Sequence, residues 1–461
     1  MKSASDHFDL AVIGAGVVGC AIFRRFCLSG LKTVLLERGA DILSGASKGN
    51  SAMLHTGYDA PTGSLELACV QAGYAEYIAI HEALNLPLLE TGGLMVAWTE
   101  EDLARLPVVV AQAQRNGVAD VRQVDAGEVR KREPNLAPDA LGGALVPREH
   151  IIDPWSAPLA YALQGIAHGG EVRRGCQVTG GDFAGGAWRL ATSKGALTAR
   201  VVINAAGLQG DLVEAIARPS PFAIRPRKGQ FVVFDKPAAR LVTSSIMPVP
   251  SERTKGVMMA RTIFGNLLVG PTAEEQEDRD HATLEQRQLQ ALIARGQRML
   301  PGLADIGVNA AYAGLRPATQ FKDYVIEALP EVNWITAAGI RSTGLTGALG
   351  IAAKTAELHG QHFGALAGAL ARVQVTVPNL AEHRLRPCNE AGYGEMVCHC
   401  ELVTRREIEG ALAGPLPATD IGGLKRRTRA MMGRCQGFYC SARVAGLAAG
   451  RIAGLPGEAL P

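Results

Sequence analysis

Four cysteines near the C-terminus have spacings that suit a metal centre. Cys398 and Cys400 are separated by one residue, and Cys435 and Cys440 follow after a gap of 34 residues. Four thiolates in two short loops can hold either a zinc ion or an iron–sulfur cluster. Structural zinc sites usually have two to four residues between paired cysteines, so the C-x-C pair favours a cluster over zinc.

A second group of residues, near the N-terminus, has the pattern of a dinucleotide site. An apolar run at residues 8–13 leads into Gly-x-Gly-x-x-Gly at residues 14–19, which apolar residues at helical spacing follow. A second apolar run, residues 32–36, ends at Glu37. This order predicts a βαβ unit whose backbone amides and helix N-terminus face a pyrophosphate. Glu37 is placed to accept hydrogen bonds from ribose hydroxyls.

NAD and FAD could each occupy such a site, and three later segments favour FAD. Residues 44–51 form a second loop of small residues, against which a diphosphate or ribityl chain could lie. Predicted strands at residues 199–204 and 334–338 each run into a glycine turn. Segments so far apart in the sequence indicate one long cofactor that several of them contact.

His55 and Tyr58 directly follow the small-residue loop and are candidates for the substrate side. If a flavin at this site takes hydride from a substrate that also loses a proton, a base must accept that proton. Histidine titrates near neutral pH, so His55 could act as that base. The alternative is that His55 only hydrogen-bonds to cofactor or backbone. Tyr58 is a candidate for substrate contact.

Composition sets the broad class. The 461 residues, 47% hydrophobic and 20% charged, fit a globular protein of two or three domains. A formal charge of +3 gives no indication of nucleic-acid binding. Neither a secretory signal nor a membrane span is apparent, so we expect a cytoplasmic protein. In a reducing compartment the C-terminal cysteines favour a metal site over disulfides.

The N-terminal fingerprint, the INAAG segment at residues 203–207 and the AAGIRSTGLTGALGIA segment at residues 337–352 together resemble a known family. They look like the D-amino-acid oxidase/glycerol-3-phosphate dehydrogenase superfamily of FAD-dependent oxidoreductases. The nearest likeness is to anaerobic glycerol-3-phosphate dehydrogenase A subunits and L-2-hydroxyglutarate dehydrogenase-like proteins. It covers roughly residues 8–360.

The resemblance implies an α/β FAD-binding Rossmann-type domain with an inserted antiparallel-sheet α+β substrate domain. We expect the oxidoreductase part to span residues 1–375. Its discontinuous FAD-binding domain would comprise about 1–85, 146–215 and 311–375, and its substrate domain about 86–145 and 216–310. A linker at 376–395 would lead to a small helical iron–sulfur domain at 396–461.

Several residue roles follow from the same likeness. Arg316, in a GxRP-like segment, corresponds to an arginine that faces an anionic substrate over the flavin, and a guanidinium suits such a clamp. Val178 would contact adenine, and Gly344, Leu345 and Thr346 would lie near the flavin and ribityl chain. With the residues of the glycine-rich segments, the predicted cofactor contacts are Gly14, Gly16, Val17, Val18, Gly19, Glu37, Arg38, Ser44, Ser47, Asn50, Ser51, Val178, Ala206, Gly207, Gly339, Gly344, Leu345 and Thr346.

The cysteine pattern and its RCQGxxC surroundings resemble the bacterioferritin-associated ferredoxin-like [2Fe–2S] domain. This likeness assigns Cys398, Cys400, Cys435 and Cys440 as cluster ligands. Met431 and Phe438 depart from the expected glycine-rich pattern, although neither change removes a ligand. Basic residues at 425–434 could stabilise a negatively charged cluster or dock an acidic electron-transfer partner.

We therefore expect an FAD-dependent dehydrogenase for a small anionic hydroxy substrate, glycerol 3-phosphate or a 2-hydroxy acid. Electrons would pass through the cluster to an acceptor protein, an additional subunit or a quinone-linked carrier, with any membrane association made through that partner. The alternatives are an amine or amino-acid dehydrogenase subunit with a proline-like or opine substrate, and a non-catalytic flavin/iron–sulfur redox sensor.

Overall fold

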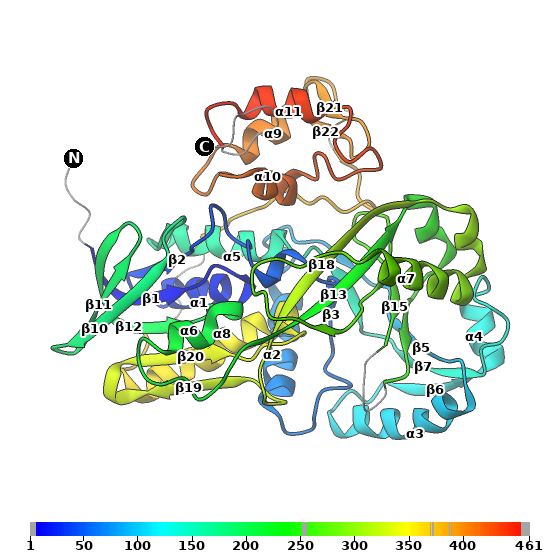
Figure 1. Cartoon of the computed structure of the whole chain (residues 1–461), viewed down its shortest axis with the longest axis horizontal. Coiled ribbons are helices and arrows are strands. Elements are labelled where there is room, and N and C mark those ends of the chain that lie inside the picture. Colours follow the sequence, from blue (N-terminus) through cyan, green and yellow to red (C-terminus); the bar gives the residue numbers. More distant parts are fainter. Residues whose placement is uncertain are drawn as a thin grey trace.

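The protein is built on two large sheets, with a small domain above them (Figure 1). A computed structural model describes residues 6–250, 256–368, 370, 373–386, 388 and 390–452. Each sheet is assembled from segments that lie far apart in the sequence, as an inserted domain requires.

The first sheet has the parallel centre of a dinucleotide-binding fold. Strand β1 (His7–Ile13) pairs in parallel with β2 (Thr33–Leu36) and β12 (Gly195–Asn204), and β12 pairs in parallel with β20 (Trp334–Ala338). In this register Ile13 lies opposite both Leu36 and Asn204, so the strands end at one edge of the sheet. The other strands of this sheet are β9 (Glu171–Arg173), β10 (Val178–Ala184), β11 (Ala187–Thr192) and β19 (Val325–Leu329).

Helices α1 (Val17–Leu28), α2 (Leu65–Ile80), α5 (Ser156–Ala167) and α8 (Gly344–His362) pack together in pairs, with α1 against α5 and α8 and α2 against α8. Arg24 is buried in α1, where Nε donates to Gln164 and Nη1 pairs with Glu76. The sheet and these helices share one apolar core. A short helix α6 (Gly210–Glu214) and a small sheet of β3 (Met53–Leu54), β4 (Leu88–Leu89) and β8 (His150–Ile152) complete this part.

The second sheet is mostly antiparallel. Its strands are β5 (Gly93–Ala97), β6 (Arg122–Asp125), β7 (Gly142–Val146), β13 (Arg225–Phe234), β14 (Ser245–Pro248), β15 (Met258–Arg261), β16 (Leu267–Gly270), β17 (Glu274–Glu275) and β18 (Val308–Ala318). Helices α3 (Glu100–Arg115), α4 (Ala126–Arg132) and α7 (Gln286–Met299) accompany it. Strand β18 pairs with β13 along its length, so the second sheet extends beyond the boundary predicted near residue 310. The division into domains otherwise stays a prediction.

The C-terminal domain is small and has its own core. Its elements are β21 (Met396–Cys398), β22 (Val403–Thr404), α9 (Arg405–Ala411), α10 (Ile421–Thr428) and α11 (Ser441–Ala448). A capping box starts α9, in which the Thr404 side chain bonds the Glu407 backbone and the Glu407 side chain bonds the Thr404 backbone. In Figure 1, α10 faces the two large sheets and α11 lies on the far side.

Gly19 shows why the first helix can lie so close to its strand. A Cβ added at Gly19 would overlap the carbonyl oxygen of Gly14, in the turn that leads into α1. Gly14 itself has φ +103°, which favours glycine. The glycines therefore allow the close packing that brings the helix N-terminus to the end of β1.

Gly19→Ala should destabilise the protein and lower its FAD content, because the clash falls on the turn itself. Overpacking of this kind typically costs about 1–3 kcal/mol. Gly360→Ala in α8 is the matched control, since no atom lies within 4 Å of a Cβ added there. It should be neutral or stabilise by up to about 1 kcal/mol through helix propensity. Thermal unfolding and the flavin-to-protein ratio would test both, and equal behaviour of the two variants would contradict this account.

Candidate active site

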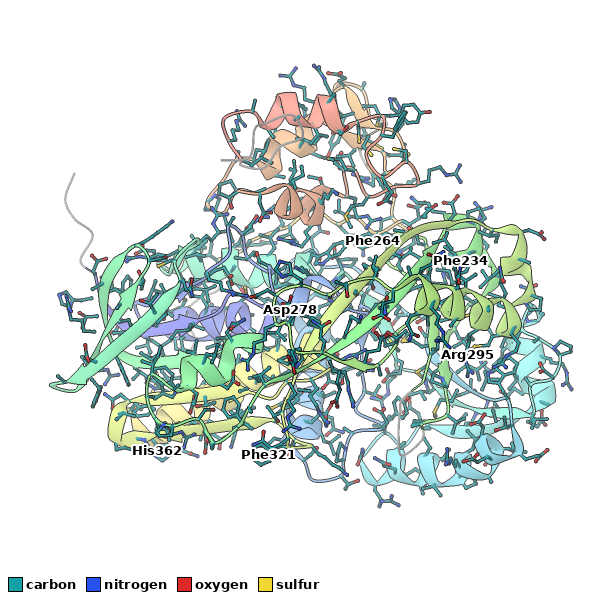
Figure 2. All side chains as sticks on the ribbon, in the orientation of Figure 1. Phe234, Phe264, Asp278, Arg295, Phe321 and His362 are labelled. Carbon is teal, nitrogen blue, oxygen red and sulfur yellow. The ribbon has the colours of Figure 1, made fainter. Side chains whose placement is uncertain are left out.

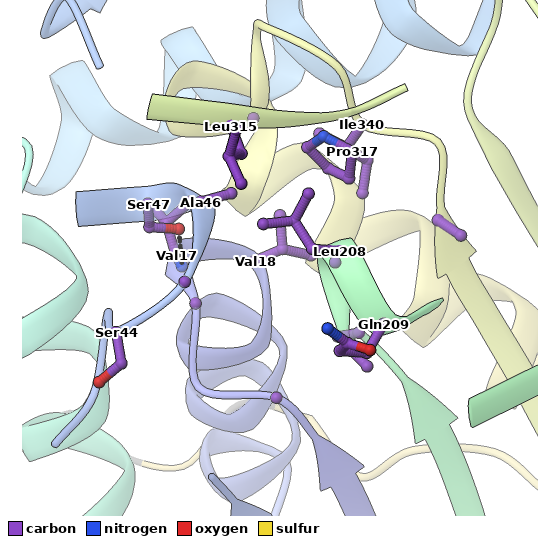
Figure 3. A pocket seen from close by; sticks show the side chains of 18 of the residues that line it. Val17, Val18, Ser44, Ala46, Ser47, Leu208, Gln209, Leu315, Pro317 and Ile340 are labelled. Atoms are coloured by element: carbon purple, nitrogen blue, oxygen red, sulfur yellow. Dashed lines mark hydrogen bonds between the residues drawn. The ribbon is translucent and has the colours of Figure 1, made fainter. Parts of the chain in front are cut away.

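A large cavity opens at the carboxyl edge of the first sheet, where Figure 3 shows it from close by. It has a volume of about 890 Å³ and is lined from both sheets. A position beyond the carboxyl ends of parallel strands is where ligands bind in open α/β sheets. Sixteen predicted cofactor contacts line this cavity, namely Gly14, Gly16, Val17, Val18, Glu37, Arg38, Ser44, Ser47, Asn50, Ser51, Val178, Ala206, Gly207, Gly339, Gly344 and Leu345.

Local hydrogen bonds hold the glycine turn in place. The Val17 amide donates to Ser47 Oγ at 3.0 Å, which ties the start of α1 to the small-residue loop (Figure 3). Glu37 accepts from the Ala15 amide at 2.9 Å and from the Gly39 amide at 2.7 Å. Burial raises the pKa of Glu37 although these amides act against the shift. The carboxylate can accept further bonds from a ligand, so its predicted ribose contact stays open.

Two predicted cofactor contacts lie outside the cavity lining. Gly19 serves the packing of α1 against the glycine turn. Thr346 is buried, accepts a hydrogen bond from the His55 amide at 2.9 Å and donates to Met53 O at 3.3 Å. Thr346 therefore links the start of α8 to strand β3 beside the cavity.

Arg316 projects into the cavity from strand β18. Its guanidinium lies over Gly229 of β13, where an added Cβ would come within 2.6 Å of Nη2. Nη2 makes a long bond of 3.5 Å to Thr272 O, and no carboxylate in the described part of the chain pairs with it. Burial, with a smaller effect of Arg227, lowers the pKa of Arg316 to about 10. The side chain thus remains cationic at neutral pH and suits an anionic ligand.

His55 lies beside the cavity but not on its lining, and it is held by a buried carboxylate. Its Nδ1 is 2.8 Å from Glu149 Oε2, and Glu149 is fully buried. The other oxygen, Oε1, accepts from the amide and the hydroxyl of Thr56. An ionised carboxylate can only accept hydrogen bonds, so it favours the tautomer of His55 that has its proton on Nδ1. In this tautomer Nε2 is the acceptor nitrogen.

Tyr58 is placed away from the cavity. It is buried in an apolar cluster, and its hydroxyl donates to Met247 Sδ at 3.7 Å. Burial raises the pKa of the phenol well above its usual value. This position gives no support to the predicted contact between Tyr58 and substrate.

Sequence reasoning missed several residues of this region. Glu149 has no local motif, and only folding brings it to His55, 94 residues away. Phe231 lines the cavity and stacks on Tyr312 with ring centroids 4.8 Å apart, while Tyr312 Oη donates to Asn50 O at 2.6 Å. The alternation of β18 could have indicated that Tyr312, Gly314 and Arg316 share one face.

The four C-terminal thiols gather in two pairs. Cys398 lies beside Cys440, and Cys400 lies beside Cys435. The Tyr439 amide, with those of Gly437 and Phe438, contributes to a lowered pKa of the Cys435 thiol. In the described ranges no three His, Cys, Asp or Glu side chains are placed to hold one metal ion. Two thiol pairs supply the four ligands of a two-iron cluster, so the residues present fit a [2Fe–2S] group.

Residues 9–358 match the protein family described as FAD dependent oxidoreductase. The chain belongs to this family. Residues 396–449 match a domain described as BFD-like [2Fe-2S] binding domain. This FAD-dependent oxidoreductase therefore binds FAD and a [2Fe–2S] cluster, and it is a dehydrogenase that transfers electrons.

Relatives share both parts of the chain. A glycerol 3-phosphate dehydrogenase from Caloramator mitchellensis is 30% identical over 452 residues, which cover 95% of this chain and 93% of the relative. One subunit of the anaerobic glycerol-3-phosphate dehydrogenase of Escherichia coli is 27% identical, with 96% and 88% covered. The FAD-bound L-α-glycerophosphate oxidase of Mycoplasma pneumoniae has the same fold, with a TM-score of 0.75 at 24% identity over 81% of this chain and 99% of the oxidase.

The iron–sulfur domain of the oxidoreductase is fixed to the flavin side by a buried carboxylate. Asp41, in the loop after β2, accepts from Arg427 Nη1 at 2.6 Å and from Nη2 at 2.9 Å. Arg174 reaches the same carboxylate at 3.3 Å and also binds Thr419. Arg426 Nη2 donates to Ile42 O at 3.0 Å. Arg426 and Arg427 belong to the basic segment that could have faced the cluster or a partner protein. Both instead bind groups of the same chain.

None of the helices in the described ranges has the length and hydrophobicity to cross a membrane.

Asp41→Asn should loosen the iron–sulfur domain. Burial alone would raise the pKa of Asp41, but Arg427, together with Arg174, holds it below the usual value. Its contribution is therefore complete above about pH 4, where the unfolded carboxyl is ionised, and is lost as pH falls through the lower folded pKa. Breaking a buried pair costs about 3–5 kcal/mol. Hydrogen exchange of the α10 amides at neutral pH should become faster in the variant.

Asp120→Asn provides the control, because Asp120 pairs with Arg148 at the surface. Such a pair contributes about 0–1 kcal/mol, so exchange in α10 should not change. The wild type should also lose α10 protection in acid, whereas Asp41→Asn should lack this step. Unaltered α10 exchange in Asp41→Asn would show that the carboxylate does not hold the domain.

Proposed function

We propose that the oxidoreductase oxidises sn-glycerol 3-phosphate at its free secondary hydroxyl. Two relatives that cover most of this chain are glycerol 3-phosphate dehydrogenases by name. The observation that carries the proposal is Arg316, a half-buried cation in the cavity without a carboxylate partner in the described residues. A guanidinium can hold a phosphate through two parallel hydrogen bonds.

Within this proposal the chain's residues bind, orient and deprotonate the substrate. A bound FAD would supply the hydride acceptor. Arg316 holds the anionic group, and strand β13 fixes the guanidinium because Gly229 leaves space for it. His55 is the proposed base, with Glu149 holding its ring so that Nε2 can take the hydroxyl proton.

A 2-hydroxy acid is the second candidate, since an L-2-hydroxyglutarate dehydrogenase from Indibacter alkaliphilus is 28% identical over 58% of this chain. Its carboxylate would suit Arg316 equally well. For the acceptor we infer another protein, because a one-electron cluster serves electron transfer and the Escherichia coli relative is by name part of a larger enzyme.

Anaerobic titration of the purified holoprotein would test the substrate. sn-Glycerol 3-phosphate should bleach the flavin absorption, and L-2-hydroxyglutarate should not. Arg316→Ala should keep FAD but need about 10–150 times more sn-glycerol 3-phosphate, as expected for the loss of a charged hydrogen bond.

Arg225→Ala is the matched control, because Arg225 is an exposed cation on the neighbouring strand β13. This variant should need the same concentration of sn-glycerol 3-phosphate as the wild type for flavin bleaching. Bleaching by L-2-hydroxyglutarate alone would make the hydroxy acid the substrate, and bleaching only by a secondary amine or amino acid would refute an alcohol dehydrogenase. Loss of FAD from Arg316→Ala would refute its role in substrate binding.

Glu149→Gln should change the pH dependence of flavin bleaching. The negative charge of Glu149 favours the protonated imidazole, so its removal should move the acid limb of the rate profile to lower pH. The maximal rate should also fall, because glutamine no longer selects one tautomer. Rapid-mixing spectroscopy at several pH values would measure both effects. An unchanged acid limb at equal FAD content would mean that His55 is not the base.

A further inference from the structure

Arg429 is fixed against the segment that carries Cys398 and Cys400 in the iron–sulfur domain. This segment, residues 396–401, is called the cluster loop. It is the C-cap of α10, has φ +69° and is buried. Its Nε donates to Glu401 Oε2 at 3.2 Å, and Glu401 directly follows Cys400. A Cβ added at Gly433 would overlap the Cys400 Cβ, so the segment after Arg429 also presses on this cysteine.

The same guanidinium contacts the oxidoreductase part. Its Cζ lies 4.1 Å from the ring centroid of Phe264, a buried residue in the loop between β15 and β16. Phe264 in turn stacks on Trp155, with centroids 5.5 Å apart and an interplanar angle of 16°. Figure 2 shows Phe264 on the side of the molecule that the C-terminal domain covers.

Trp155 connects this stack to the flavin cavity. It directly follows Pro154, which lines the cavity, and its Nε1 donates to Lys48 O at 3.2 Å. The neighbours of Lys48, Ser47 and Gly49, line the cavity. The same loop touches strand β18, which carries Arg316, through the bond from Tyr312 to Asn50. A continuous set of packed groups therefore joins the cavity to Cys400.

We propose that Trp155, Phe264 and Arg429 are positioning residues that hold the cluster loop against the flavin cavity, and that electrons cross from flavin to cluster at this contact. The proposal rests on the two cofactors and not on the identity of the substrate. Two electrons leave the reduced flavin one at a time. Each converts one ferric ion of the cluster to ferrous iron, and a one-electron acceptor outside the chain reoxidises the cluster between the steps. The flavin protons pass to water.

The contact suits this role because Phe264 and Arg429 are buried where they meet. Electron tunnelling slows steeply as the gap between donor and acceptor widens, so a fixed approach is required. A buried guanidinium over an aromatic face is a stable contact, since the cation is attracted to the ring and is weakly hydrated. Asp41 and Arg427 anchor α10 at one point, and Arg429 supplies a second contact next to the cysteines.

Phe264→Leu tests the contact, because it keeps an apolar side chain and removes the ring. The flavin of the holoprotein is reduced anaerobically by a light pulse with EDTA, and the cluster is followed by its absorption and its EPR signal. The loss of a cation–π contact should lower the ratio of docked to undocked domain by about 2- to 30-fold. Cluster reduction should slow accordingly while flavin reduction does not change. Hydrogen exchange of residues 396–401 should become faster in the same variant, without any turnover.

Arg429→Gln tests the cation separately and should give the same two changes. Phe438→Leu is the control, because Phe438 lies between two ligand cysteines yet is 81% exposed and makes an edge-to-face contact with Tyr439. It should leave flavin-to-cluster transfer and exchange unchanged. Wild-type transfer rates in both Phe264→Leu and Arg429→Gln would overturn the proposal, as would equal slowing in Phe438→Leu. If sn-glycerol 3-phosphate fails to bleach the flavin, the proposed function is refuted. The light-driven measurement of flavin-to-cluster transfer does not change, because light and not the substrate supplies the electrons.

Discussion

The structure depends on the register of β1 between β2 and β12. Because Ile13 lies opposite both Leu36 and Asn204, three chain segments leave the first sheet at one level. The glycine turn, Glu37 and the 205–207 turn then surround one cavity without a long loop. Strand β20 extends this edge through its pairing with Asn204, which brings Gly339 and the start of α8 to the same place. A shift of one residue would turn each buried side chain to the other face and separate these turns.

Local signals in the sequence predicted the parts of the site that are local in space. The glycine turn, the acid after β2 and the paired cysteines depend on backbone geometry within a few residues, so their spacing is visible in the chain. The pairing of His55 with Glu149 depends on how β3 and β8 meet, which no short motif encodes. Tyr58 shows the converse case, since its substrate contact stays a prediction that its position does not support. It is close to His55 in sequence, but Gly57, at φ +84°, turns the chain and Tyr58 enters an apolar cluster.

The boundary at β18 has a related cause. The strand carries Arg316 to the cavity at the edge of the first sheet. By the position of this side chain, the strand belongs with the flavin-binding part. By hydrogen bonding it belongs to the second sheet, since β13 pairs with it from Arg225 to Phe234. Substrate residues and cofactor residues thus meet at the boundary between the two sheets. Neither composition nor periodicity distinguishes the two sides of such a boundary.

The buried carboxylate at Asp41 also bears on how this protein can be rearranged. Its cationic partner Arg427 comes from the C-terminal domain, and a Cβ at Gly423 would overlap the carboxylate, so the two surfaces are shaped for each other. Removal of the last domain would therefore leave Asp41 with Arg174 as its cationic partner in place of Arg427, and would uncover an apolar surface, including Phe264, that the oxidoreductase part does not cover by itself. The iron–sulfur domain therefore cannot be exchanged for another without changes to the surface that it contacts. Any ancestral fusion or engineered exchange of it must alter the loop after β2 and the β15–β16 loop in concert.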